Sequence, residues 1–331
     1  MASIKDVAAT AGVSVGTVSN VMNNPNRVSP KTVDKVQAAI DQLGFVRNDA
    51  ARRLRAGRSR SIGMIVLDVS NPFFTDLARG AEDTAMLQGL TVLLGNSAED
   101  PIRETSYLDL FEEQRVRGVL ISPFGDFEDR LTQLKAHGIP AVLVDRGSET
   151  NAFSSVSVDD TAGGKLAVEH LLNTGKTRIG FVGGPFAIRQ VADRFAGAQA
   201  AIAEHATATL EVFATTALTV LEGLRIGEQI LELAPEDRPD ALFAANDLVA
   251  VGLLQALVMG DSVRVPEDIA IVGFDDIAFA RTAIVPITSV RQPSHLMGET
   301  ALSILLEEAD EPGLTPRQIV FQPELVIRAS A

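Results

Sequence analysis

Polar side chains with forked hydrogen-bonding groups occur at six places in this 331-residue chain, each after a short apolar run. They are Asn71, Asp145 with Arg146, Arg194, Asn246, Asp275 and Gln292, and Phe73 and Phe74 follow the first of them. Amides, carboxylates and guanidiniums can each hold two neighbouring hydroxyls, and a phenyl ring covers the apolar face of a sugar. The set predicts a site for a small polyhydroxylated ligand.

Each of these residues also has a purely structural interpretation. Asp145 and Asp275 are suited to capping the helices that follow them, and the two phenylalanines are suited to a helix start in the core. Arg194 alone would be an ordinary surface arginine. All six positions being structural is the less favoured alternative, because carboxyl ends of parallel strands are where such sheets bind ligands.

From Ile62 onward, short apolar runs alternate with amphipathic segments, which predicts parallel sheets covered by helices on both faces. The predicted strands are Ile62–Leu67, Thr91–Leu94, Gly118–Ser122, Ala141–Val144, Ser155–Val158, Arg178–Val182, Leu210–Ala214, Ala241–Ala244, Ile269–Gly273 and Thr288–Val290. The predicted helices are 73–88, 102–115, 161–174, 192–204, 220–233, 247–258 and 294–308. So many strands favour two doubly wound lobes over a single sheet.

The N-terminal segment has a different pattern. Ile4, Val7, Ala8 and Ala11 recur at helical spacing, and Gly12 is suited to end that helix in a left-handed conformation. Ser14 is suited to cap a second helix, and two short helices across a tight turn predict a helix-turn-helix unit that reads the major groove of DNA. Ser29 and Pro30 predict the start of a third helix, which Gly44 ends.

Charge divides along the chain in the same way. Residues 1–60 carry a net charge of +6, whereas the whole chain carries −14, so the remainder carries −20. A basic head on an acidic body favours phosphate binding at one end only. A charged, solvated arm is the alternative interpretation, and the helical apolar periodicity of the segment disfavours it.

Several classes of protein are disfavoured. No apolar run reaches the roughly 18–20 residues of a membrane span, and the N-terminus lacks a signal-peptide core, so we expect a cytoplasmic protein without membrane attachment. The chain has no cysteine, and its four histidines lack metal-ligand spacing. No nucleophile–base pair is evident, so we expect neither an enzyme nor a bound cofactor or metal ion.

The whole chain resembles the LacI/GalR family of bacterial transcription regulators. The segments that carry the resemblance are IKDVA, AGVSVGTVS and VSPKT in the head, and SNPFF, VDR, GFVGGP, AANDLVAVG, AIVGFDD and RQP in the body. It implies an all-α helix-turn-helix head followed by an α/β effector domain with two lobes, similar to periplasmic sugar-binding proteins. The predicted divisions are 1–47 for the head, 48–60 for a hinge helix and linker, and 61–331 for the effector domain, with lobes of about 61–160 plus 293–322 and about 161–290 plus 323–331.

For the head, the resemblance implies a recognition helix that exposes Val15, Gly16, Thr17, Ser19 and Asn20. Ser3, Thr17, Asn23 and Arg27 would contact phosphates. Asn20 is suited to adenine and Val15 to a thymine methyl. Many relatives have arginine at the position of Asn20, so the operator sequence does not follow from the resemblance.

A hinge helix is implied over residues 48–54. Leu54 would insert into the minor groove and kink the DNA, and Ala50 and Ala51 would allow close approach to the groove floor. Asn48 is suited to cap this short helix, which has too little apolar surface to be stable alone.

For the body, residues corresponding to Asn71, Phe73, Phe74, Asp145, Arg146, Arg194, Asn246, Asp275 and Gln292 surround a pentose in the ribose-binding branch of this fold. The purine-binding relatives have tryptophan at the position of Arg146, and this chain has no tryptophan. The resemblance therefore implies ribose or a close relative, with a nucleoside or a sugar phosphate as alternatives.

Together these features predict a homodimeric repressor of sugar-utilisation genes. It would bind a double-stranded palindromic operator and respond to a sugar effector bound between its lobes. A sugar-binding protein without DNA function is the competing interpretation from another class.

Overall fold

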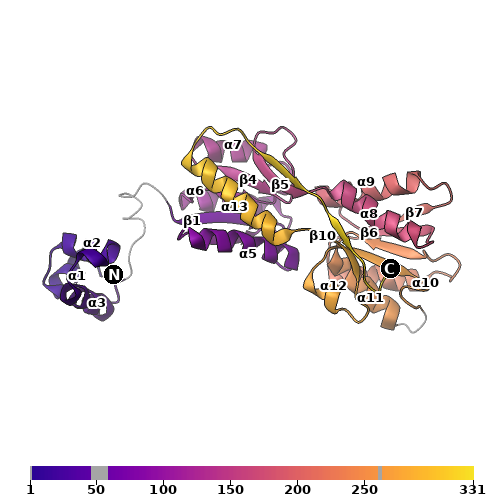
Figure 1. The fold of residues 1–331 in the computed structure, drawn as a ribbon, viewed down its shortest axis with the longest axis horizontal. Helices are drawn as coiled ribbons and strands as arrows, with labels where there is room; N and C mark the ends of the chain where they lie inside the picture. Colours follow the sequence, from indigo (N-terminus) through magenta and orange to yellow (C-terminus); the bar gives the residue numbers. More distant parts are fainter. Residues whose placement is uncertain (1, 46–58, 260–262) are drawn as a thin grey trace. The chain divides into compact units, whose positions relative to one another are not determined.

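A computed structural model of the protein describes residues 2–45, 59–259 and 263–331. The chain divides into two compact units, residues 1–58 and residues 59–331, and each is described by itself (Figure 1). The proposed hinge residues Ala50, Ala51 and Leu54 lie outside the described residues.

The first unit is a small helical bundle. Its elements are α1 (Ile4–Ala11), α2 (Val15–Asn23), the 3-10 turn η1 (Pro25–Arg27) and α3 (Pro30–Leu43). The predicted caps are present, because the Ser14 hydroxyl accepts a hydrogen bond from the Thr17 amide and Gly12 has φ 65°. The core of the bundle consists of Val7, Ala8, Val18, Val21, Val36 and Ala39. One predicted cap differs, because the Ser29 hydroxyl bonds to the Thr32 hydroxyl rather than to a helix amide.

Two six-stranded sheets form the second unit. The first sheet has the order β11-β5-β4-β3-β1-β2, and every pairing in it is parallel. Its strands are β1 (Ser61–Val66), β2 (Thr91–Asn96), β3 (Val119–Ile121), β4 (Ala141–Val144), β5 (Ser154–Val158) and β11 (Gln318–Phe321). Its helices are α5 (Pro72–Leu87), α6 (Pro101–Glu113), α7 (Glu128–Ala136) and α13 (Ser294–Asp310).

The second sheet has the order β12-β10-β9-β8-β6-β7. Its strands are β6 (Arg178–Gly183), β7 (Thr209–Ala214), β8 (Ala241–Ala244), β9 (Ala270–Asp275), β10 (Thr288–Arg291) and β12 (Glu324–Val326). Its helices are α8 (Asp160–Asn173), α9 (Arg189–Ala203), α10 (Val220–Glu232), α11 (Asp247–Met259) and α12 (Ala278–Thr282). Four of the pairings are parallel, but β12 runs antiparallel to β10.

Helices on both faces explain why the central strands are apolar at almost every position. In β1, Met64 faces the core shared with α5 and α13, whereas its neighbour Ile65 faces the core shared with α6 and α7. In β6, Phe181 and Val182 divide in the same way between two cores. Alternate residues of one strand therefore fill two separate cores, as expected for buried parallel sheets.

The chain passes from one sheet to the other three times: from β5 to α8, from β10 to α13 and from β11 to β12 (Figure 1). The two sheets with their helices are called lobe 1 and lobe 2 below. The sequence prediction did not include β11, β12, α7 or α12. Within the described ranges, no helix combines the length and apolarity required to cross a bilayer.

Candidate functional site

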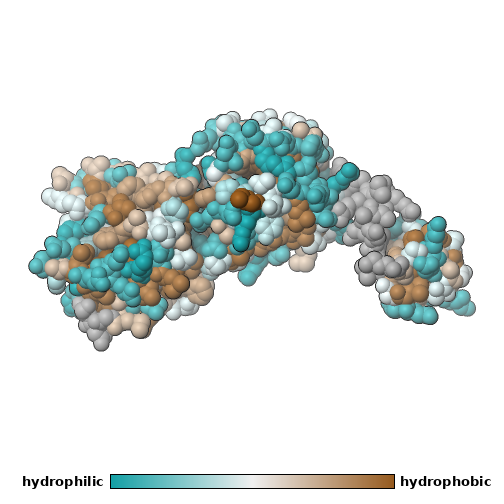
Figure 2. Space-filling view, turned by 180° about the vertical axis from the view of Figure 1, so that it is seen from behind, coloured by the Kyte–Doolittle hydropathy of each residue, from teal (hydrophilic) through white to brown (hydrophobic). Residues whose placement is uncertain are grey.

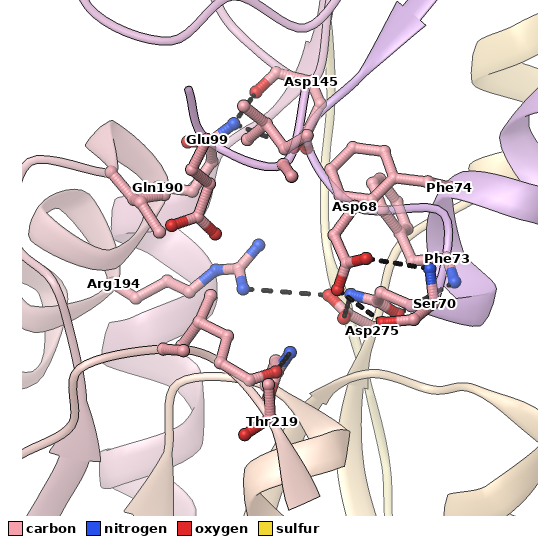
Figure 3. A pocket seen from close by; sticks show the side chains of 17 residues that line it. Asp68, Ser70, Phe73, Phe74, Glu99, Asp145, Gln190, Arg194, Thr219 and Asp275 are labelled. Atoms are coloured by element: carbon pink, nitrogen blue, oxygen red, sulfur yellow. Dashed lines mark hydrogen bonds and ion pairs between the residues drawn. The ribbon is translucent and has the colours of Figure 1, made fainter. Parts of the chain in front are cut away.

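A cavity of about 360 Å³ is lined by residues of both lobes (Figure 3). Its walls come from the carboxyl ends of strands in both sheets, where Asp68, Asp145, Asn246 and Asp275 follow or end β1, β4, β8 and β9. This is the position at which doubly wound sheets bind ligands. The volume is within the range of small-molecule sites.

The structure brings seven of the nine predicted residues to this cavity. They are Asn71, Phe73, Phe74, Asp145, Arg194, Asn246 and Asp275. The other two, Arg146 and Gln292, do not line it, and this corrects the predicted grouping. Whether any of the nine contacts a ligand stays a prediction.

Arg146 lies outside this lining, and the residue before it, Asp145, has a left-handed backbone with φ 59°. The Arg146 guanidinium lies 5.0 Å from the centre of the Phe127 ring and lines a neighbouring cavity of about 270 Å³. Gln292 lies behind the wall, where its side-chain amide donates to the Asp275 carboxylate at 2.8 Å. Its role here is to orient Asp275.

Arg194 is the cation of the cavity and is almost fully buried. Its Nε donates to Asp160 at 2.8 Å and its Nη1 donates to the Ala245 carbonyl at 2.7 Å. Nη1 is also 3.7 Å from an oxygen of Asp275, and the guanidinium lies 3.7 Å from the centre of the Phe274 ring. These contacts fix the plane of the guanidinium, which is an arrangement suited to forked recognition.

Asp145 offers a free acceptor. Gln190 of lobe 2 donates to the Asp145 carboxylate oxygen Oδ2 at 2.8 Å and to its backbone carbonyl at 2.6 Å. The other carboxylate oxygen, Oδ1, is buried and has no hydrogen-bond partner within the described residues. A buried acceptor without a partner is costly, so this atom is suited to accept a hydrogen bond from a ligand.

Asn71 and Asp275 join the lobes across the cavity. The Asn71 amide donates to Asp275 at 3.1 Å, while its carbonyl oxygen accepts from the Phe73 amide and caps α5. Asp275 has φ 106°, so its side chain follows a strained turn at the end of β9. Each of the two residues therefore forms a hydrogen bond with the other lobe.

The Asn246 side chain has local partners. Its carbonyl oxygen accepts from the Val249 amide at 2.9 Å, and its amide donates to the Leu218 carbonyl at 3.3 Å. The structure therefore gives this residue the role of capping the start of α11. Contact with a ligand would need one of these bonds to be exchanged.

Phe73 and Phe74 fit both the structural interpretation and the ligand-binding interpretation. They belong to the buried core of lobe 1 and also line the cavity. Their ring centres are 5.0 Å apart and the ring planes are inclined by 71°, an edge-to-face arrangement. They form an apolar wall that a sugar face or a planar ring can cover.

The charges of the site lie in a poorly solvated environment. Burial raises the pKa of Asp145 well above its ordinary value, and Asp160 adds to this shift. Burial raises the pKa of Asp160 to about 6 against the opposing effect of Arg194. Burial also raises the pKa of Asp275, and Arg194 again opposes it. A donor from a ligand would favour the charged forms of these carboxylates.

Several polar residues that line the cavity were not among the predicted site residues. They are Asp68, Ser70, Glu99, Gln190 and Thr219. Gln190 lies four residues before Arg194 on α9, so helical spacing would have placed both on one face. Glu99 follows β2, which extends two residues beyond the predicted end of that strand.

The predicted recognition helix α2 exposes Val15, Gly16 and Asn20. Thr17 and Ser19 are half-buried. The Thr17 hydroxyl bonds to the Ser14 hydroxyl, and the Ser19 hydroxyl accepts from the Asn23 side-chain amide. Ser3, Asn23 and Arg27 are also exposed. The Ser3 hydroxyl donates to Asp6 within the capping box of α1, so a phosphate would have to compete with that bond.

Comparisons with known proteins agree with both units. Residues 3–48 match the family described as bacterial regulatory proteins, lacI family, and residues 168–331 match a periplasmic binding protein-like domain. The chain is 34% identical over 334 residues to an HTH-type transcriptional repressor PurR from Vibrio campbellii (strain ATCC BAA-1116), an alignment that covers 99% of this chain and 98% of that protein.

Two solved structures are similar over most of their length. A lac repressor dimer bound to operator and the anti-inducer ONPF has a TM-score of 0.82 and 27% identity, covering 99% of this chain and 98% of that one. A LacI family transcriptional regulator from Enterococcus faecium with bound ribose has a TM-score of 0.74 and 28% identity, covering 82% of this chain and 98% of that one. These likenesses confirm the predicted fold class, a helix-turn-helix head followed by a two-lobed α/β domain.

Proposed function

We propose that this chain, which belongs to the lacI family of bacterial regulatory proteins, is a repressor of sugar-utilisation genes. A small sugar bound between its lobes would control it. A transcriptional repressor aligned along nearly its full length supports the general function, and the chemistry of the cavity supports the sugar. Ribose is the simplest candidate.

The free oxygen of Asp145 carries the proposal for the ligand. This oxygen needs a hydrogen-bond donor, and Asp145 lines the same cavity as Arg194 and the Phe73–Phe74 wall. A pentose supplies hydroxyl donors on its edges and an apolar face. Hydrogen bonds to charged groups of this kind contribute roughly 1.5–3 kcal/mol each.

A purine is the second candidate, because the similar Vibrio protein is named PurR. The edge-to-face phenylalanines are able to stack on a planar base. Against it, no tryptophan occurs in this chain. The family resemblance implies a tryptophan at the position of Arg146 in the purine-binding relatives. The carboxylate-rich lining also favours a ligand with several hydroxyl donors.

For the DNA contacts, we propose that Val15, Gly16, Thr17, Ser19 and Asn20 face bases in the major groove and that Ser3, Thr17, Asn23 and Arg27 contact phosphates. The exposure of Val15 and Asn20 on α2 supports the assignment. Ala50, Ala51 and Leu54 would approach the minor groove when the hinge helix forms on DNA.

We further propose that two copies pair through the edge of lobe 1. Hydrophobic side chains gather in patches on the surface of both lobes (Figure 2). In lobe 1, exposed apolar residues lie on the edge strand β2 and on its neighbours α5 and α6: Met86, Leu87, Leu93, Leu94, Ile102 and Leu110. A second copy is the occupant that we infer, because the similar lac repressor was solved as a dimer on operator.

Effector binding would bias the arrangement of the lobes. Contacts that cross between them include Gln190 with Asp145 and Asn71 with Asp275. A ligand that shares these groups binds one arrangement better than the other, and only this difference in affinity shifts the equilibrium. A tenfold effect on operator occupancy requires about 1.4 kcal/mol.

Calorimetry on the full chain tests the effector. We expect D-ribose to bind and to raise the melting temperature, and guanine, hypoxanthine and adenosine to bind at least tenfold more weakly. Binding of guanine or hypoxanthine alone would transfer the proposal to the purine candidate. Binding of none of the four would contradict both.

A mobility shift on a library of palindromic operators, at a stated salt concentration, tests the DNA function. Asn20→Ala should lower the affinity for the selected operator at least tenfold, because a bidentate base contact contributes about 1–3 kcal/mol. Gln37→Ala on the exposed face of α3 is the matched control and should leave affinity unchanged. If the wild type bound all sequences with equal affinity, the competing interpretation, a sugar-binding protein without DNA function, would be supported.

A further inference from the structure

The lining of the effector cavity is unbalanced in charge. Asp68, Glu99, Asp145 and Asp275 contribute carboxylates, and Arg194 is the one cation among the described residues of the lining. Arg194 is also shared, because it pairs with Asp160 at 2.8 Å and lies 3.7 Å from Asp275. Its charge is thus largely compensated before a ligand arrives.

Glu99 has the weakest structural role of these carboxylates. No described cation forms an ion pair with it, whereas Asp275 is held by Asn71 and Gln292 and Asp145 by Gln190. Burial and the negative charge of Asp68 both raise the pKa of Glu99. The residue is half-buried, so its charge acts on the cavity with less screening than a surface charge.

The loop that carries Glu99 is fixed. Ala98 and Glu99 both have left-handed backbones, with φ 51° and 58°. The Asn96 side chain accepts hydrogen bonds from the Ala98 and Val69 amides, which ties the loop after β2 to the loop after β1. Asp68 on that second loop is held by the Ser70 amide and hydroxyl. Figure 3 shows the Glu99 and Asp68 side chains at the same cavity as Asp145 and Arg194.

The arginines able to receive an anionic group lie elsewhere. Arg146 and Arg189 line the neighbouring cavity, and Arg189 is already paired with Glu149 and Asp193. The Asp145–Gln190 hydrogen bond borders both cavities. A phosphate on a ligand in the effector cavity would therefore meet carboxylates without an uncommitted cation.

We propose that Glu99 sets the charge selectivity of the effector cavity, excluding phosphorylated sugars and nucleotides while accepting neutral polyols and polyols that carry a protonated amine. The inference rests on the proposed function and narrows its ligand class. A charge that repels a ligand of the same sign gives a site specificity against that ligand. The free oxygen of Asp145 gives a protonated amine a place to donate.

Three probes with one carbon skeleton test the proposal by calorimetry on the full chain: D-ribose, D-ribose 5-phosphate and the cationic analogue 1,4-dideoxy-1,4-imino-D-ribitol. The wild type should bind the phosphate at least about a hundredfold more weakly than D-ribose and the cationic analogue more tightly. Glu99→Gln should reduce both ratios by about tenfold, since it removes one unit charge at close range. Glu211→Gln on exposed β7, outside the cavity, is the matched control and should change neither ratio.

The outcomes separate the two claims. Binding of D-ribose together with an equally strong phosphate complex would overturn the charge selectivity alone, as would a Glu99→Gln variant with wild-type ratios. Binding of none of the probes would overturn the sugar proposal and the selectivity with it. Titration at two salt concentrations adds a second measurement, because a selectivity of electrostatic origin shrinks as salt rises.

Discussion

Asp145 is placed to serve both position and recognition. Gln190 holds one of its carboxylate oxygens, and the other oxygen has no partner within the described residues. If the proposed ligand donates to this oxygen, the charge that aids binding also destabilises the empty protein, because the carboxylate is buried. Stability and affinity should therefore respond in opposite directions to its removal.

Asp145→Asn tests this opposition. We expect ligand affinity to fall by about ten- to a hundredfold, since a charge-assisted hydrogen bond is lost, while the melting temperature of the free protein rises or stays equal. Calorimetry and thermal melts measure the two quantities. Asp129→Asn on exposed α7 is the control. A variant that loses both stability and affinity would indicate a purely structural role for Asp145.

Glu104 on α6 predicts a pH dependence of stability. Its carboxylate is buried and accepts from the Phe124 amide at 2.8 Å, and burial raises its pKa from 4.5 to about 7. Between these values the unfolded chain releases a proton that the folded chain retains, so this group lowers the free energy of unfolding as pH rises from 4.5 to 7.

Glu104→Gln should remove that contribution while keeping an acceptor for Phe124. We expect the variant to gain stability over the wild type between pH 5 and pH 8, by about 1–2 kcal/mol after allowance for partial solvent screening. Urea unfolding at the two pH values gives the difference. Parallel pH profiles of the two proteins would contradict the assignment.

Residue types predicted much of the site. Asn71, Asp145 and Asp275 meet at one cavity because they follow or end parallel strands whose carboxyl ends meet there, and Arg194 reaches the cavity from α9. Arg146 lines the neighbouring cavity instead, and no local sequence pattern indicates the direction of its side chain. Gln190 was not predicted because it precedes residue 192, the predicted start of its helix, although on α9 it shares a face with Arg194.

At the scale of elements, small residues set how closely helices approach. Gly164 on α8 packs against α9, where an added Cβ would lie 2.0 Å from the Arg194 carbonyl oxygen. The helix that carries the cation of the cavity is therefore positioned by a glycine on its neighbour. Their contact is a backbone contact, so no side-chain rotation can relieve an overlap.

Gly164→Ala should displace α9 and with it Arg194. We expect a loss of about 1–3 kcal/mol in the free energy of unfolding and a fall in ligand affinity larger than at any exposed control. Gly147→Ala is the matched variant, since an added Cβ there meets nothing within 4 Å. Unchanged ligand affinity in a destabilised Gly164→Ala protein would show that the position of Arg194 does not depend on this contact.

Elements with a strong hydrophobic period were predicted well, and short edge elements were not. The apolar strands β1, β4 and β8 are buried on both faces, so composition alone revealed them. By contrast, β11 and β12 each carry exposed residues beside half-buried ones and lie at sheet edges. β11 pairs with β5, which lies more than a hundred residues earlier in the chain. β12 pairs with β10, which runs antiparallel to it.

At the scale of the whole molecule, the apolar edge of lobe 1 predicts a dimer. Leu94 is 46% exposed on β2, the edge strand of its sheet. Leu94→Lys should shift the protein from dimer to monomer and weaken operator binding, because each half-site then binds one head independently. Light scattering after size exclusion measures the mass. Leu314→Lys, at a 40% exposed site outside this edge, should remain dimeric. A Leu94→Lys protein that stays dimeric would place the interface elsewhere.

Because the chain passes between the lobes three times, neither lobe is encoded by one continuous stretch of the gene. Lobe 1 takes α13 and β11 from beyond all of lobe 2 except β12, and lobe 2 takes β12 from beyond β11. A gene fragment cut after β5 would encode a sheet without its outer strand and a core without the helix that covers it. Neither half can be copied, lost or exchanged by a single break in the gene, so recombination would have to move the pair as one piece.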